Sequence, residues 1–140
     1  MDMDAEREAK LDILLAKDNR YDRAAYLFVC QAVNIIAREI AVKKRQSKEK
    51  HISSLQLLQG MKKLLLVKYG CMAIDVLQAW NVNSTDDFGN IVFNLADVNL
   101  LGTSENDSRE DFNQRFSFHD AFVAPFQAKG QLRKMPVINL

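Results

Sequence analysis

Residues 21–46 read YDRAAYLFVCQAVNIIAREIAVKKRQ, and this stretch predicts the longest helix of the fold. Its apolar residues recur at steps of three and four, which is the period of one helix face. They are Tyr21, Ala25, Phe28, Ala32, Ile35 or Ile36, and Ile40. The first half is apolar on nearly every side between Ala24 and Cys30, which is typical of a central helix covered by others. The second half becomes charged and ends in KKR at 43–45.

Similar patterns lie on both sides of this stretch. The expected helices cover residues 4–17, 21–46, 53–69, 72–80 and 85–99. Ser53 with Gln56, and Ser84 with Asp87, have the spacing of capping pairs at helix starts. Gly70 is typical of a helix stop. The sequence therefore predicts an all-α protein, a compact bundle of five to six helices.

The remaining residues favour one domain with a tail. Ser108 and Asp111 predict a helical turn, after which four phenylalanines are spaced to dock on the core: Phe112, Phe116, Phe118 and Phe122. A chain of 140 residues suits a single domain. We expect residues 1–124 to form one helical domain and residues 125–140 to be a flexible C-terminal tail.

Residues 72–111 have the order of a helix-turn-helix-like pair. Leu100, Leu101 and the polar residues that follow would form a short winged-helix-like extension. The second helix of the pair would be the DNA-reading one, but it carries three aspartates and no Lys or Arg. Phosphate contacts supply most of the affinity for DNA, so an acidic helix opposes binding. We interpret the pair as a packing element.

The formal net charge of +1 hides two opposite regions. Residues 38–68 hold nine Lys and Arg against two Glu, a net +7, whereas residues 69–124 have a net charge of −7. Candidate contacts to nucleic acid or to an acidic partner are Lys43, Lys44, Arg45, Lys48, Lys50, Lys62 and Lys63. The alternative is a solvated helix end, and we favour it because such clusters are common on soluble helices.

No cofactor or metal site is predicted. The two histidines, His51 and His119, lack the spacing of zinc ligands. Cys30 and Cys71 are far apart, and both are expected to be buried thiols in a reducing cytosol. The sequence contains no G-x-S-x-G, no G-x-G-x-x-G and no P-loop.

The N-terminus is acidic and does not read as a signal peptide. The longest strictly apolar run has about seven residues (24–30), short of a membrane span. We therefore expect a cytoplasmic protein without membrane contact. Its expected partner is another protein or a second copy.

A set of positions across residues 20–123 resembles a family of short bacterial proteins of uncharacterised function. The positions are Tyr26, Phe28, Val29, His51, Leu57, Leu58, Gly60, Tyr69, Gly70, Met72, Ala73, Val76, Leu77, Trp80, Asp111, Phe112, Ala121 and Phe122, together with TDDFGNIVFNL at 85–95. The 85–95 motif is the most specific part. The resemblance implies a bacterial, cytoplasmic, self-contained domain and carries no activity with it.

These observations favour a non-enzymatic protein-interaction or regulatory module. One alternative is a nucleic-acid-binding protein that uses residues 38–68. Another is an enzyme of unidentified class, built from scattered polar residues such as Asp86, Asp87 and His51.

Overall fold

The computed structural model describes residues 3–43, 52–102 and 108–127 of the chain. This part forms five α-helices: α1 (Met3–Lys17), α2 (Arg23–Lys43), α3 (Ser54–Tyr69), α4 (Ala73–Ala79) and α5 (Thr85–Asp97). Four short turns of helix complete it: η1 (Gly70–Met72), η2 (Arg109–Phe112), η3 (His119–Val123) and η4 (Ala124–Phe126). The described residues include no strand, and the prediction of an all-α protein is confirmed.

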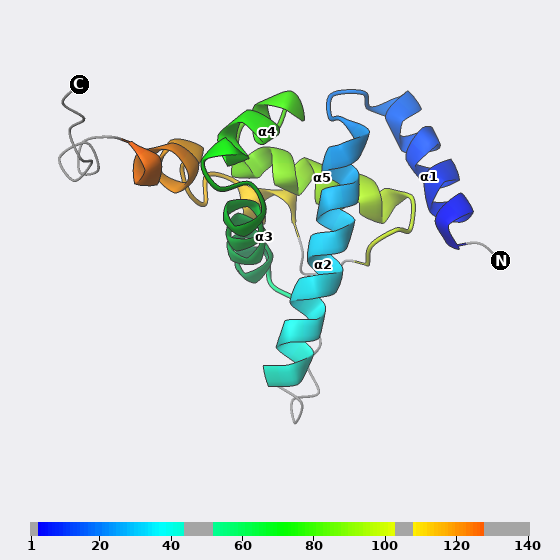
Figure 1. Ribbon diagram of the computed structural model, residues 1–140. Coiled ribbons are helices and arrows are strands. Elements are labelled where there is room, and N and C mark those ends of the chain that lie inside the picture. The colour runs from blue at the N-terminus through cyan, green and yellow to red at the C-terminus, as the bar shows by residue number, and fades with distance from the viewer. Residues whose placement is uncertain (1–2, 44–51, 103–107, 128–140) are drawn as a thin grey trace, which may run out of the picture.

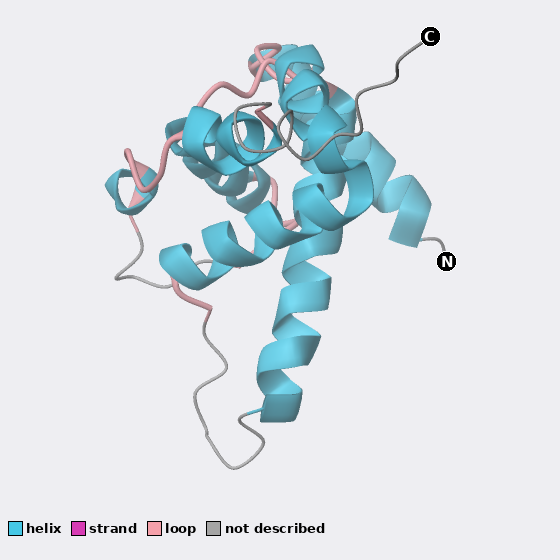
Figure 2. Ribbon diagram, turned by 60° about the vertical axis from the view of Figure 1, so that its left-hand side comes forward, coloured by secondary structure: helices cyan, strands magenta, loops and turns pink. Residues whose placement is uncertain are grey.

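α2 is the helix against which α1, α3 and α5 pack (Figure 1). Ala25, Tyr26, Val29 and Ala32 are fully buried in its first half, so the prediction of a central helix is confirmed. Beyond Ile36 the sequence becomes polar, and α2 leaves the core. Its last turns extend past the other helices in both views (Figures 1 and 2).

A side-chain cap marks the start of α3, whereas the described residues form none at the start of α5. At α3, Ser53 Oγ accepts a hydrogen bond from the Gln56 amide (3.1 Å), and Gln56 Oε1 accepts one from the Ser53 amide (2.9 Å). This predicted capping pair is confirmed. The predicted Ser84–Asp87 pair is wrong, because the Ser84 side chain makes no capping bond within the described residues. The Asp87 carboxylate is instead used by Tyr21 and by the Asn83 amide.

The phenylalanine-rich segment after α5 folds back over α5 and α3. Gly89 lets this segment come close to α5, since a Cβ there would lie 2.7 Å from Cβ of Phe112. The buried Thr85 hydroxyl donates to the carbonyl of Phe112 (2.5 Å) and accepts from the Arg115 amide (3.1 Å). The rings of Phe116, Phe118 and Phe122 contact one another, Phe118 also contacts Phe88, and Phe112 contacts Phe93. All four except Phe116 are buried, so their predicted docking is confirmed.

The prediction of two buried thiols is confirmed for Cys30 and wrong for Cys71. Cys30 is buried as expected, whereas Cys71 is exposed, because η1 turns it outward between α3 and α4.

α4 and α5 occupy the predicted places of the helix-turn-helix-like pair, joined by a turn in which Asn81 has a φ of 63°. Their likeness to that motif stays a prediction. Residues 103–107, which would belong to the extension, lie outside the described part.

Candidate functional site

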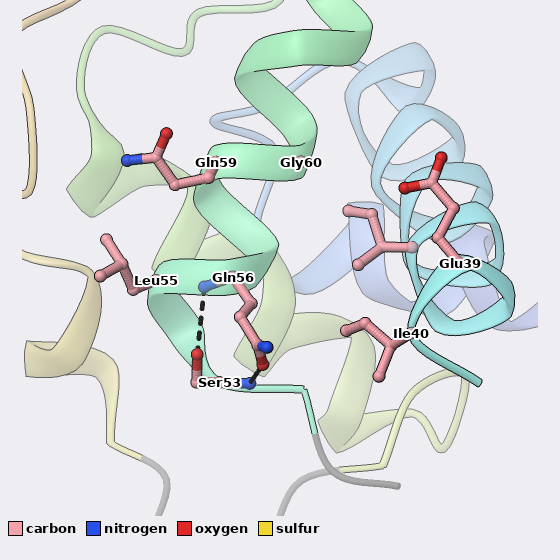
Figure 3. Close-up of a pocket in the computed structure, with 8 residues that line it drawn as sticks. Glu39, Ile40, Ser53, Leu55, Gln56, Gln59 and Gly60 are labelled. Carbon is pink, nitrogen blue, oxygen red and sulfur yellow. Dashed lines mark hydrogen bonds between the residues drawn. The ribbon is translucent and has the colours of Figure 1, made fainter. Parts of the chain in front are cut away.

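An open, mainly apolar groove of about 370 Å³ lies between the second half of α2 and the first half of α3. Its lining residues are Ile36, Glu39 and Ile40 from α2, and Ser53, Leu55, Gln56, Gln59 and Gly60 from α3. Figure 3 shows Glu39 and Ile40 on one side, facing Ser53, Gln56 and Gly60 on the other. We call this feature the α2–α3 groove.

Gly60 and Ile36 set the depth of the α2–α3 groove. A Cβ at position 60 would lie 2.4 Å from Cδ1 of Ile36, so the Ile36 side chain occupies the space that a larger residue at position 60 would need. Ile36 is buried at this crossing, while Ile40, one turn further along α2, is half-buried. The groove therefore opens where α2 leaves the core and its apolar residues lose their cover.

The α3 wall begins with a capping box. The reciprocal Ser53–Gln56 bonds hold the first turn of α3 in a fixed geometry (Figure 3). Gln59 is exposed, and Leu55 is 48% exposed at the outer edge of this wall. An exposed apolar surface with a polar rim is typical of a binding surface.

The predicted basic site is only partly within the described residues. Lys44, Arg45, Lys48 and Lys50 lie outside them, and so does the side chain of Lys43, the last residue of α2. Lys63 is exposed, and helical spacing places it one turn beyond Gln59 and Gly60 on the same side of α3. Lys62 is half-buried, and its Nζ lies 5.6 Å from the ring centre of Phe116. Lys62 and Lys63 therefore lie in different environments, although they are adjacent in the sequence.

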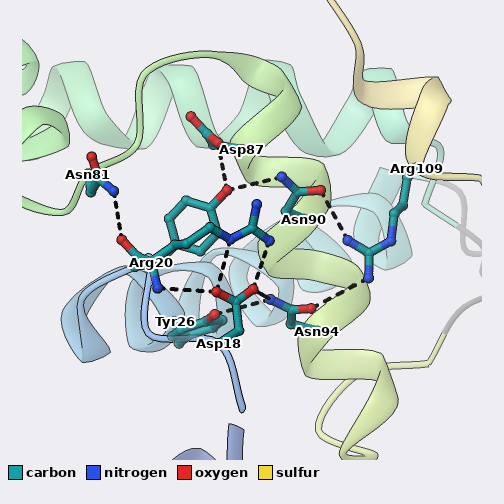
Figure 4. A network of polar contacts seen from close by, with 9 residues as sticks. Asp18, Arg20, Tyr26, Asn81, Asp87, Asn90, Asn94 and Arg109 are labelled. Carbon is teal, nitrogen blue, oxygen red and sulfur yellow. Dashed lines mark hydrogen bonds and ion pairs between the residues drawn. The ribbon is translucent and has the colours of Figure 1, made fainter. Parts of the chain in front are cut away.

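A separate feature is a network of hydrogen bonds between residues 18–22, which link α1 to α2, and α5 (Figure 4). Asp18 accepts from Nη2 and Nε of Arg20 (2.7 and 2.9 Å) and from Nδ2 of Asn94 (2.9 Å). Asn94 also reaches the hydroxyl of the buried Tyr26 (3.2 Å). Arg109 closes the far side, donating to Oδ1 of Asn90 (3.0 Å).

Tyr21 lies at the centre of this network. Its hydroxyl donates to Oδ1 of Asp87 (2.6 Å) and accepts from Nδ2 of Asn90 (3.0 Å). Burial, reinforced by the Asp87 carboxylate, raises the pKa of Tyr21 to about 12. The hydrogen bond from the Arg20 side chain holds the pKa of Asp18 well below its ordinary value. The Tyr21 hydroxyl therefore stays neutral and the Asp18 carboxylate stays ionised near neutral pH. Both hydrogen-bond the link between α1 and α2 to α5.

Of the three residues of the enzyme alternative, the structure describes Asp86 and Asp87. Asp87 is bonded to Tyr21 and to the Asn83 amide, and His51 lies outside the described residues. Asp86 lines a cavity of about 560 Å³ that also includes Ser84, Ser117 and His119, and its Oδ1 accepts from the Gln114 amide (2.8 Å). Among the described residues, no three His, Cys, Asp or Glu side chains gather as metal ligands would.

α2 is long and apolar enough to be a candidate membrane span. Within the described residues it is the one helix that passes the test for a membrane span, over Arg23–Val42 with a mean hydropathy of 1.5. The core helix of a soluble protein passes the same test, and 39% of this window is buried in the fold. The expectation of no membrane contact stays a prediction.

Neither the α2–α3 groove nor the polar network around Tyr21 was predicted from the sequence. Ile36, Ile40 and Gly60 read as ordinary helix positions, because a groove depends on the crossing of two helices. Asn90 and Asn94 did carry a signal, since they are four residues apart and so share one side of a helix whose other side is apolar.

Comparison of the chain with protein-family models, with curated proteins and with solved structures gives no match in any of the three. The resemblance to a bacterial family therefore stays a prediction.

Proposed function

We propose that this protein is a non-enzymatic interaction module that holds a segment of another protein in the α2–α3 groove. The observation that supports this proposal is an aliphatic groove, left open where α2 leaves the core. Burying Ile40 and its apolar neighbours under a partner would contribute a favourable transfer free energy of about 25 cal/mol for each Å² removed from water, against which the entropic cost of association is set.

The lining of the groove favours protein over nucleic acid. Bases are held by stacking on aromatic rings or on Arg planes. Among the described residues that line the groove, none is aromatic and the single charged one, Glu39, repels phosphate. Nucleic-acid binding through residues 38–68 remains the alternative, carried by the sequence charge alone.

Site-specific photocrosslinking in the native cell tests the proposal. A photoreactive residue replaces Gln59, which is exposed and lines the groove; the matched control replaces Gln78, which is exposed on α4. We expect a discrete protein adduct from position 59 and none from position 78. A nuclease-sensitive adduct at position 59, or identical adducts from both positions, would contradict the proposal.

A turnover assay completes the test. The proposal predicts no activity in a broad hydrolase screen of the purified chain. An activity that is lost on replacing Asp86 or His119, while Gln59 variants keep it, would favour the enzyme alternative and its cavity near the start of α5.

A further inference from the structure

We infer that two copies of this chain form a weak, parallel, two-fold dimer through one exposed side of the end of α2. This inference goes beyond the proposed function, because it concerns a side of α2 that borders the α2–α3 groove only at Glu39. We call this side the α2 end face, and its residues are Ile35, Arg38, Glu39 and Val42.

Two apolar side chains of the α2 end face are exposed. Ile35 is 39% exposed and Val42 is 72% exposed, whereas Ile36, the neighbour of Ile35, is buried. Residues seven apart lie two turns apart on one side of a helix, so Ile35 and Val42 form a short apolar stripe. α2 extends past the other helices in this region (Figures 1 and 2), which leaves room for a second helix.

A cation and a carboxylate flank this stripe. Arg38 and Glu39 are both exposed, and neither side chain has an ion-pair partner among the described residues. Successive helix positions are about 100° apart, so the stripe passes between Arg38 and Glu39. Each α2 end face therefore presents one positive and one negative flank.

This charge arrangement is complementary to itself. When two helices pack in parallel around a two-fold axis, one flank of each faces the opposite flank of the other. Arg38 of each copy would then face Glu39 of the second copy, while Ile35 meets Ile35 and Val42 meets Val42. In an antiparallel pair equal flanks meet, so Arg38 would face Arg38. The charges therefore favour a second copy in the parallel arrangement.

The contact is short. Ile35 and Val42 are about 10.5 Å apart along the helix axis. Such a contact is smaller than the standard interface of about 800 Å² per partner, so we expect a dissociation constant between about 10 μM and about 1 mM.

Sedimentation equilibrium of the full chain tests the inference. The native chain should shift from monomer to dimer between about 10 μM and about 1 mM. Val42→Gln should weaken this dimer by at least about tenfold, because it removes apolar contact from both copies. Val67→Gln is the matched control, since Val67 is 77% exposed near the C-terminal end of α3 and its replacement should leave the dimer unchanged.

Charge reversal tests whether the partner is a second copy. Arg38→Glu leaves two carboxylates on each α2 end face and Glu39→Arg leaves two cations, so each variant alone should dimerise at least about tenfold more weakly. An equal mixture of the two variants should form a heterodimer of native affinity, measured by fluorescence anisotropy of one labelled variant. The double variant, which exchanges the two charges, should dimerise as the native chain does. Raising the salt should reduce these differences.

Disulfide trapping tests the parallel arrangement. Cys71→Ser first removes the exposed native thiol. In this background Val42→Cys should form a covalent dimer under mild oxidation with diamide, because the two positions face each other. Val67→Cys is the control and should form no covalent dimer above background.

Four outcomes would overturn the inference. A chain that stays monomeric at about 1 mM would reject the dimer. Charge-reversed variants that dimerise like the native chain, or a mixture that fails to restore dimerisation, would place the contact elsewhere. Trapping that requires a mixture of Ile35→Cys and Val42→Cys chains would show an antiparallel pair. Binding of a monomeric chain to anionic vesicles, lost in Val42→Gln, would assign the α2 end face to a membrane surface.

Discussion

The hydroxyl of Tyr21 donates a 2.6 Å hydrogen bond to Oδ1 of Asp87, across 66 residues of sequence. Tyr21 precedes α2 and Asp87 lies in the first turn of α5, so this bond fixes the start of one core helix to the start of another. Asn90 bonds the same hydroxyl from the next turn of α5.

Replacing Tyr21 by Phe removes these two hydrogen bonds and keeps the buried ring. We expect Tyr21→Phe to lower the free energy of unfolding by about 1–3 kcal/mol, because Asp87 and Asn90 each lose a partner in a half-buried setting. Urea unfolding measures the change. Tyr69→Phe is the control, since Tyr69 contacts Trp80 and Lys68 through its ring and should keep both contacts. Equal losses in the two variants would contradict the assigned role of Tyr21.

Asp18 should make stability depend on pH. The hydrogen bond from Arg20 lowers the pKa of Asp18, so the folded chain binds this proton more weakly than the unfolded chain does. Its stabilising contribution is therefore complete above the unfolded pKa of about 3.9 and is lost as pH falls through the folded pKa. Urea unfolding between about pH 6 and about pH 2 should show a steeper fall for the native chain than for Asp18→Asn. Parallel curves would show that Asp18 is not linked to folding.

Two glycines should respond differently to alanine. Gly89→Ala places a Cβ 2.7 Å from Cβ of Phe112, which cannot turn away as a side-chain tip could. We expect a loss of about 1–3 kcal/mol from overpacking. Gly102→Ala meets nothing within 4 Å and should stay within about 0.5 kcal/mol of the native chain. Thermal unfolding of both variants measures the contrast, and a harmless Gly89→Ala would refute the close packing of α5 on η2.

The two serines at helix starts offer a paired test of capping. Ser53→Ala removes a bond to the Gln56 amide and should cost about 1 kcal/mol. Ser84→Ala removes no capping bond within the described residues and should cost less than about 0.5 kcal/mol. Urea unfolding of the two variants compares them directly. The reverse order would mean that Ser84 is the working cap.

The two thiols should differ in reactivity. Cys71 is exposed and should react with a disulfide reagent such as DTNB in the folded chain. Cys30 is buried, and burial raises the pKa of its thiol, so both access and thiolate formation are reduced. Absorbance should record one thiol per folded chain and two in denaturant. Cys71→Ser should remove the fast reaction, and a fast reaction that persists in this variant would place Cys30 at the surface.

Local patterns in the sequence predicted the helices well. The stretch from Phe88 to Leu95 is apolar on one side and buried on that side. Ser53 and Gln56 cap α3 as their spacing predicts, because a capping box involves only residues three apart. The same pattern gave a wrong prediction at Ser84, because the Asp87 carboxylate bonds to Tyr21, which is 66 residues away in the sequence.

The candidate site was harder to predict. A charge count marked residues 38–68, but it did not distinguish Lys63, beside the groove, from Lys62, which lies over Phe116. One position along a helix is a turn of about 100° around its axis, so adjacent lysines face different neighbours.

The sequence by itself determined the helices, their apolar sides and the opposite charges of the two halves, because each depends on residues a few positions apart. Tertiary structure alone decided that the Ile36 side chain of α2 packs against Gly60 of α3, that a groove opens there, and that Tyr21 joins Asp87. These features depend on how helices cross, and a crossing is the sum of many weak contacts between residues far apart in the chain.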